Sequence, residues 1–122
     1  MAWCNTSTSI PALELWSARA VGRGQANTTA MLGVCTSGAA NSANTYYTPT
    51  TNAGDWFLGS LGEMMLMYTN LSYAGVGGFD GNSVWSSTGF ADTISLYQNF
   101  LSGSQYAYTK LNLMHARSMR AF

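Results

Sequence analysis

The spacing of apolar residues changes along this chain, and the change falls near Gly75. Before Gly75, apolar residues recur every third or fourth position, as in helices that bury one face. After it, short alternating runs are separated by glycines or polar turns, which is typical of β-strands. The chain has 122 residues, enough for one core. We therefore expect a single domain over residues 1–122, with an α+β fold, a high loop content and an antiparallel sheet in its second half.

Two helices are expected in the first part of the chain. The first covers residues 11–21, where Leu13 and Trp16 follow helical spacing and should point into the core. The second starts near Asn27, whose side chain can cap the residues that follow. Residues 36–54 are small and polar, which predicts a loop, with one short helical turn as an alternative.

Residues 60–63, Ser-Leu-Gly-Glu, match a capping box. In this motif the Ser60 hydroxyl accepts from the Glu63 amide, while the Glu63 carboxylate accepts from the Ser60 amide. A helix should therefore begin at Leu61 and run toward the glycines that start at Gly75. Short strands are expected over residues 55–58, 83–87, 93–100, 105–110 and 115–122.

The chain contains two cysteines, Cys4 and Cys35. A disulfide between them is the favoured interpretation, and two buried free thiols are the alternative. A zinc site is not expected, because no further cysteine completes a ligand set. A disulfide would point to an oxidising compartment, so we expect a secreted or bacterial cell-surface protein whose secretion signal lies outside this sequence.

Charged side chains make up 8% of the chain, against roughly 25% in typical soluble domains, and five basic residues balance five acidic ones. A nucleic-acid partner is not expected, because phosphate binding needs a clustered basic surface. No apolar run is long enough to cross a membrane, so direct membrane insertion is not expected either.

The sequence offers little catalytic chemistry. His115 is the only histidine, and the five acids form no close pair that would suit a glycosidase. Asp80 and Asn82 could offer oxygens to Ca²⁺, but a calcium site needs about six to eight oxygen ligands. We expect no enzyme activity and no catalytic or metal-ligating residues, with calcium kept as the alternative to having no cofactor.

The last thirty positions are basic. Residues 93–122 contain Lys110, Arg117 and Arg120 and no acid, which gives a net charge of +3. A sulfated or carboxylated ligand could bind such a surface. The alternative is that Arg117 and Arg120 are structural and bind buried carbonyls and acids.

Tyrosines gather in the same region, at Tyr97, Tyr106 and Tyr108. Tyrosine offers a large, rigid contact area and serine adapts its hydrogen bonds, a mixture found in antibody paratopes. These residues therefore suit a binding surface. The alternative is an ordinary solvated hairpin with cross-strand tyrosine pairs.

Five segments together resemble one known family: GRGQANTTAML at 22–32, DWFLGSLGEMMLMYTNL at 55–71, GVGGF at 75–79, WSST at 85–88 and RSMRAF at 117–122. The chain resembles the Lcl C-terminal domain family, named for the Legionella collagen-like adhesin. The resemblance implies a C-type-lectin-like fold of the formylglycine-generating-enzyme type, used as a surface-exposed binding domain. It also implies a trimeric head that binds sulfated glycosaminoglycans in attachment and biofilm formation. Family domains usually begin with a strand ahead of Trp3, so this chain is expected to be truncated there.

Variable proteins of diversity-generating retroelements form a second branch of this fold, and their C-terminal segment is rewritten to change the ligand. The chain resembles that framework at WSST, QNF, SGSQ, Lys110 and RSMRAF, which implies that the residues in between bind the ligand. With Lys110 added for its charge, the expected ligand-binding residues are Phe90, Asp92, Ser95, Tyr97, Tyr106, Tyr108, Lys110, Leu111, Leu113 and His115.

Two departures limit what the resemblance implies. Formylglycine-generating enzymes use two cysteines late in the chain, and nothing after Cys35 is cysteine; calcium lectins carry a Trp-Asn-Asp motif, whereas this chain has Trp85-Ser86-Ser87. We expect a non-enzymatic, surface-exposed domain that binds a protein or a sulfated polysaccharide on a host or neighbouring cell. The alternatives are a trimeric glycosaminoglycan-binding adhesin head, a degenerate formylglycine-type enzyme, and a structural homotrimer that caps a stalk.

Overall fold

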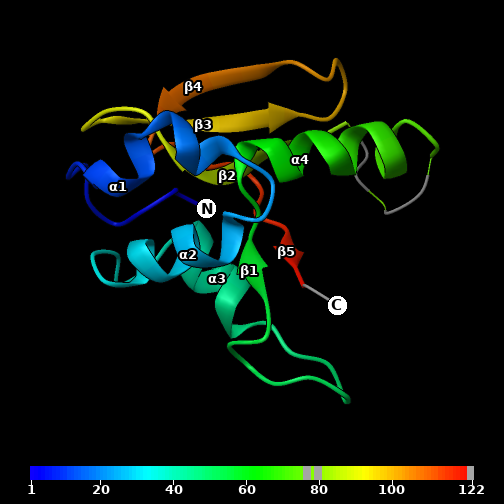
Figure 1. The fold of residues 1–122 in the computed structure, drawn as a ribbon, viewed down its shortest axis with the longest axis horizontal. Helices are drawn as coiled ribbons and strands as arrows, with labels where there is room; N and C mark the ends of the chain where they lie inside the picture. Colours follow the sequence, from blue (N-terminus) through cyan, green and yellow to red (C-terminus); the bar gives the residue numbers. More distant parts are fainter. Residues whose placement is uncertain (76–77, 79–80, 121–122) are drawn as a thin grey trace.

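The computed structural model describes residues 1–75, 78 and 81–120, and it confirms the α+β class. Helical elements occupy the first half and most strands the second (Figure 1). In chain order the elements are α1 (Pro11–Glu14), the 3₁₀ turn η1 (Trp16–Arg19), α2 (Gly24–Leu32), α3 (Ala39–Thr45), β1 (Phe57–Leu58), α4 (Leu61–Met67), the π turn η2 (Tyr68–Ser72), β2 (Ser83–Gly89), β3 (Ile94–Asn99), β4 (Gln105–Thr109) and β5 (Ser118–Met119).

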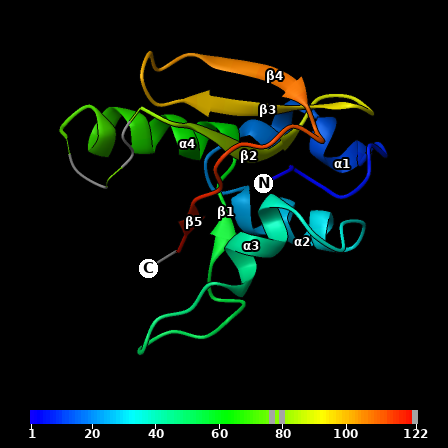
Figure 2. The same ribbon diagram turned by 180° about the vertical axis from the view of Figure 1, so that it is seen from behind.

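Strands β2, β3 and β4 form the expected antiparallel sheet, in that spatial order. Helices α1, α2 and α4 pack against this sheet, and α2 and α3 lie beside β1 (Figures 1 and 2). The sheet is therefore backed by helices that precede it in the chain, and β4 forms its outer edge.

Strand β5 does not join the three-stranded sheet, and it is shorter than the strand expected over 115–122. It pairs antiparallel with β1, with Met119 opposite Phe57. The reason lies just before β5, where the amide of Trp85 donates to the carbonyl of His115 at 3.0 Å. This contact fixes the chain along the free side of β2, from which it continues to β1. Residues 121 and 122 lie outside the described part of the chain.

Part of the N-terminal segment is buried in the core. Trp3 is fully buried, and its indole N–H donates to the carbonyl oxygen of Ser86 at 2.7 Å. Beside it, Cys4 and Cys35 form a disulfide with an S–S distance of 2.06 Å, as the favoured interpretation predicts. The disulfide ties this segment to the end of α2.

The expected helix over 11–21 is wrong beyond Glu14. The backbone is extended at Leu15, with φ −72° and ψ 146°, and only a short 3₁₀ turn follows. The 3₁₀ turn does not lengthen into an α-helix toward residue 22, because the carbonyl oxygen of Ala18 accepts instead from Asn27 Nδ2 at 2.8 Å and from Thr88 Oγ1 at 3.0 Å. Tertiary partners replace the helical ones, and Trp16 is left 79% exposed.

The expected start of the second helix is also wrong. Helix α2 begins at Gly24, and Asn27 is buried within it instead of capping it. A Cβ at Gly24 would collide with Glu63 Oε1 and approach the Phe57 ring to 2.9 Å, so only glycine fits there. Within the loop expected over 36–54, the short helical turn becomes the seven-residue helix α3.

The capping box is confirmed. The Glu63 amide donates to Ser60 Oγ at 3.3 Å, and the Ser60 amide donates to Glu63 Oε1 at 2.8 Å. Glu63 also accepts from the Gly22 amide at 3.0 Å, which anchors the turn after η1 to the start of α4. The helix itself ends at Met67 and continues as the π turn η2.

Candidate ligand-binding surface

Strand pairing gathers the three tyrosines on one face of the sheet. Tyr97 lies opposite both Trp85 on β2 and Tyr106 on β4, and Tyr108 lies opposite Ser95. Residues paired across a sheet share a face, so these side chains are neighbours. The ring centroid of Tyr97 lies 5.9 Å from that of Tyr106 and 6.4 Å from that of Tyr108. We call Tyr97, Tyr106 and Tyr108 the tyrosine face.

The tyrosine face is anchored on its inner side and open on its outer side. Trp85 is fully buried and meets Tyr97 edge-on, with the ring centroids 6.2 Å apart. On the edge strand β4, Tyr106 is 50% exposed and Tyr108 is 47% exposed. Burial, together with the Tyr106 and Tyr108 phenols, raises the pKa of Tyr97, so its hydroxyl is neutral near pH 7.

The opposite face of the hairpin is held against α4. Gln105 donates from Nε2 to the carbonyl oxygen of Leu61 at 2.9 Å and to Gln98 Oε1 at 2.8 Å. Gln98 is fully buried. These contacts fix the hairpin, so the tyrosine rings are presented by a strand that is already ordered.

Two of the expected ligand-binding residues are not on the surface. Lys110 is fully buried, and its ammonium donates to the carbonyl oxygen of Thr8 at 2.9 Å, so the expectation that it contacts a ligand at the surface is wrong. Ser95 is also fully buried, beneath the pairing of β3 with β2 and β4. Lys110 is instead part of the packed core, because the apolar stem of its side chain can pack as a core residue does.

The other expected residues separate into two groups. Phe90 and Asp92 lie in the turn between β2 and β3, and Leu111 follows β4 at the same end of the sheet, because the Lys110 amide donates to the carbonyl of Thr93. All three are exposed, as is Leu113. His115 is exposed too but lies along β2, at the edge of the sheet opposite β4 (Figure 2).

Only two of the three basic residues of the C-terminal third lie close together. Lys110 lies in the core, whereas Arg117 and Arg120 flank β5 and line hollows with Trp56. Lys110 is thus separated from the two arginines, because β5 leaves the sheet that carries β4.

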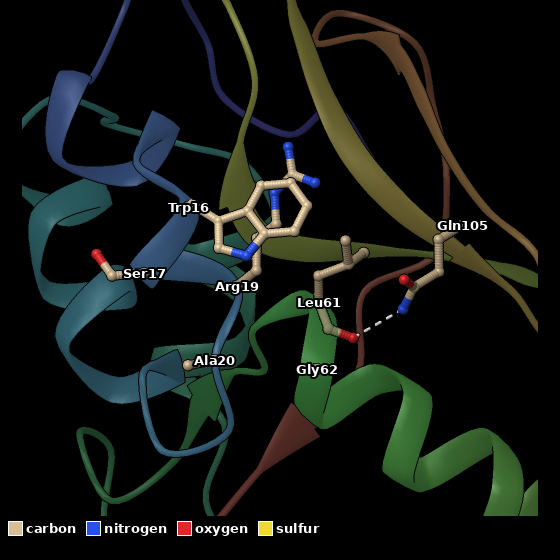
Figure 3. Close-up of a pocket in the computed structure, with 7 residues that line it drawn as sticks. All are labelled: Trp16, Ser17, Arg19, Ala20, Leu61, Gly62 and Gln105. Atoms are coloured by element: carbon tan, nitrogen blue, oxygen red, sulfur yellow. Dashed lines mark hydrogen bonds between the residues drawn. The ribbon is translucent and has the colours of Figure 1, made fainter.

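Sequence reasoning placed Trp16 in the core and so missed a hollow on the other side of β4. Trp16, Arg19, Leu61 and Gln105 are among its lining residues (Figure 3). The spacing of Trp16 and Arg19 was the available signal, because residues three apart become neighbours in a helical turn.

In the described part of the chain, no group of three or more His, Cys, Asp or Glu side chains could hold a metal ion. The expected calcium ligand Asp80 lies outside the described residues. Among residues 1–75, 78 and 81–120, no helix is long and apolar enough to span a bilayer. Comparisons with family models, curated proteins and solved structures find no match.

Proposed function

We propose that this chain is a non-enzymatic ligand-binding domain with a C-type-lectin-like fold, secreted or displayed on a bacterial surface, which binds a protein through its tyrosine face. One observation carries the proposal: Tyr106 and Tyr108 are half exposed on an edge strand while Tyr97 packs them onto the buried Trp85. Pre-ordered aromatic side chains lose little entropy on binding, and they dominate the energetics of many protein interfaces.

The resemblance to the Lcl C-terminal domain family supports the fold and the role. The α+β class, the exposed C-terminal hairpin and the Cys4–Cys35 disulfide agree with an extracellular binding module of that kind. The variable proteins of diversity-generating retroelements would place their ligand on the same hairpin.

A protein is favoured over a sulfated polysaccharide as the ligand of this surface. The burial of Lys110 removes the expected cation nearest to the tyrosine face. The exposed acid Asp92 lies at the same end of the sheet as Lys110. Sulfate groups need clustered cations, whereas tyrosine side chains offer apolar area and neutral hydroxyls.

The test uses two probes, a displayed library of random peptides and heparin, each at about 0.1 M and about 1 M NaCl, between which the screening length falls from about 10 Å to about 3 Å. We expect selected peptides to bind at both salt concentrations and to lose binding in Tyr106→Ala and Tyr108→Ala. Tyr47→Ala is the matched control, because Tyr47 is 69% exposed and lies outside the sheet.

The variants must remain folded for this result to count. Both tyrosines are half exposed, so each substitution should change the free energy of unfolding by about 1 kcal/mol or less. Peptides whose binding ignores Tyr106→Ala and Tyr108→Ala would contradict the proposal. Heparin binding that falls steeply with salt would support the adhesin-head alternative instead.

A further inference from the structure

A hollow of about 370 Å³ lies between η1, the start of α4 and strand β4. Its lining includes Gln105, which alternates along β4 with Tyr106 and so lies on the opposite face of the hairpin from the tyrosine face. Small-molecule sites usually have volumes of about 300–1,000 Å³. The hollow is therefore large enough for a small ligand and separate from the surface proposed above.

Its walls are mostly apolar. Trp16 is 79% exposed, which is unusual for an indole in a small folded domain, and Leu61 and Ala20 line the hollow with it. Figure 3 shows Leu61 between the Trp16 indole and the Gln105 amide. An indole beside an aliphatic side chain provides contact area for the C–H groups of a ring-shaped ligand.

The hollow contains one cation. The guanidinium carbon of Arg19 lies 4.2 Å from the centroid of the Trp16 ring, which orients the side chain. Arg19 forms no ion pair with an acid in the described part of the chain; its Nε is buried without a hydrogen-bond partner there, so a ligand would meet the two Nη groups. The nearby acid Glu63 is occupied by the Gly22 and Ser60 amides. An unpaired guanidinium in an otherwise uncharged hollow is complementary to one carboxylate, which it can bind through two parallel hydrogen bonds.

The polar group on the opposite wall is an acceptor. Both hydrogen bonds of the Gln105 amide use its Nε2, to Leu61 and Gln98, so its Oε1 accepts none from the described residues. A fixed amide oxygen suits a ligand hydroxyl. A ligand that is complementary to the apolar area, the guanidinium and the acceptor is a ring that carries both hydroxyls and a carboxylate.

We propose that this hollow binds an unsulfated sugar acid, a single hexuronic acid residue, with its ring against Trp16 and Leu61, its carboxylate on Arg19 and a hydroxyl on Gln105 Oε1. A sulfated chain is a poorer fit, because several sulfate groups need several cations and the lining residues include only Arg19. An aromatic carboxylate would leave the Gln105 acceptor without a donor.

The test is a titration of the ¹⁵N-labelled protein with methyl β-D-glucuronide, followed through the indole N–H resonance of Trp16. We expect a saturable shift, and binding about tenfold weaker for methyl β-D-glucoside, which lacks the carboxylate. Arg19→Gln should weaken glucuronide binding by about the same factor, and Arg23→Gln is its control because it removes an exposed charge from the neighbouring turn.

Trp16→Ala tests the apolar wall and should abolish the interaction, read from the backbone resonances of Leu61 and Gly62. Trp16 is largely exposed, so this variant should stay folded, and Tyr106→Ala should bind the glucuronide as the parent does. The proposal is overturned if glucuronide fails to bind, if glucoside binds as tightly, or if Trp16→Ala and Arg19→Gln leave binding unchanged. Because Tyr106→Ala affects only peptide binding, failure here and failure of the proposed function are distinguishable.

Discussion

The Lys110 ammonium lies 4.8 Å from the centroid of the Trp3 indole ring, and both side chains are fully buried. The same two residues are joined through their backbones, because the Trp3 amide donates to the Lys110 carbonyl at 2.8 Å. The lysine therefore fastens the N-terminal segment to the end of β4. Its positive charge is held by the π-face of an indole and by the carbonyl of Thr8.

Lys110→Ala should destabilise the fold. The substitution removes a buried four-carbon side chain and leaves a cavity beside Trp3, so we expect the free energy of unfolding to fall by about 2–4 kcal/mol. Urea denaturation followed by tryptophan fluorescence measures the loss. Arg120→Ala is the control, because Arg120 is exposed and should change stability little. Equal stability of the two variants would contradict the packing role of Lys110.

Stability should depend on the titration of Lys110. Burial lowers the pKa of Lys110 below its ordinary value of 10.5, while the charges of Glu14 and Asp92 oppose that shift. The folded protein thus holds this proton less tightly than the unfolded chain, so stability rises as pH increases through the lowered pKa toward 10.5. The raised pKa of Tyr97 removes stability only as pH rises above 10.

Lys110→Met isolates that contribution, because methionine keeps the side-chain length without the charge. Urea denaturation between about pH 7 and about pH 10 should show stability rising more with pH in the parent than in Lys110→Met. If the free energy of unfolding changed with pH in the same way in both proteins, the assignment of this pH dependence to Lys110 would be contradicted.

Loss of the Cys4–Cys35 disulfide should also destabilise the protein. The bond joins residues 31 positions apart, so the chain-entropy estimate of its contribution is about 3–4 kcal/mol. We expect the double variant Cys4→Ala/Cys35→Ala to have a lower Tm than the oxidised parent in calorimetry. A Tm within a degree or so of the parent would show that the core holds the N-terminal segment without the bond.

Ser60→Ala should weaken the junction between η1 and α4. The Ser60 hydroxyl accepts from the Glu63 amide and donates to the carbonyl oxygen of Ala20 at 2.8 Å, so the variant loses a helix cap and a tertiary bond. The expected loss of stability is about 1–2 kcal/mol, measured by urea denaturation. Ser37→Ala, at an exposed position, serves as the control; a similar small change in both would argue against the capping role.

Part of the candidate surface could be predicted from the sequence. The alternation of residues 93–110 predicts a hairpin, and cross-strand pairing then places Tyr97 beside Tyr106. The same alternation carries no information on Lys110, whose position in a strand of exposed residues suggested a surface cation. Its burial depends on Trp3 and Thr8, more than 100 positions away in the chain.

The sequence alone determined the α+β class, the capping box at Ser60 and Glu63, and the three strands of the main sheet. Each depends on groups a few positions apart, so the stabilising contacts form within one element and leave a local pattern. Only the tertiary structure decided where the helix after Pro11 breaks, why β5 pairs with β1, and that Trp16 is exposed beside Arg19 while Lys110 is buried. Those outcomes depend on hydrogen bonds and packing between distant segments, which contribute free energy only once the chain has closed around its core.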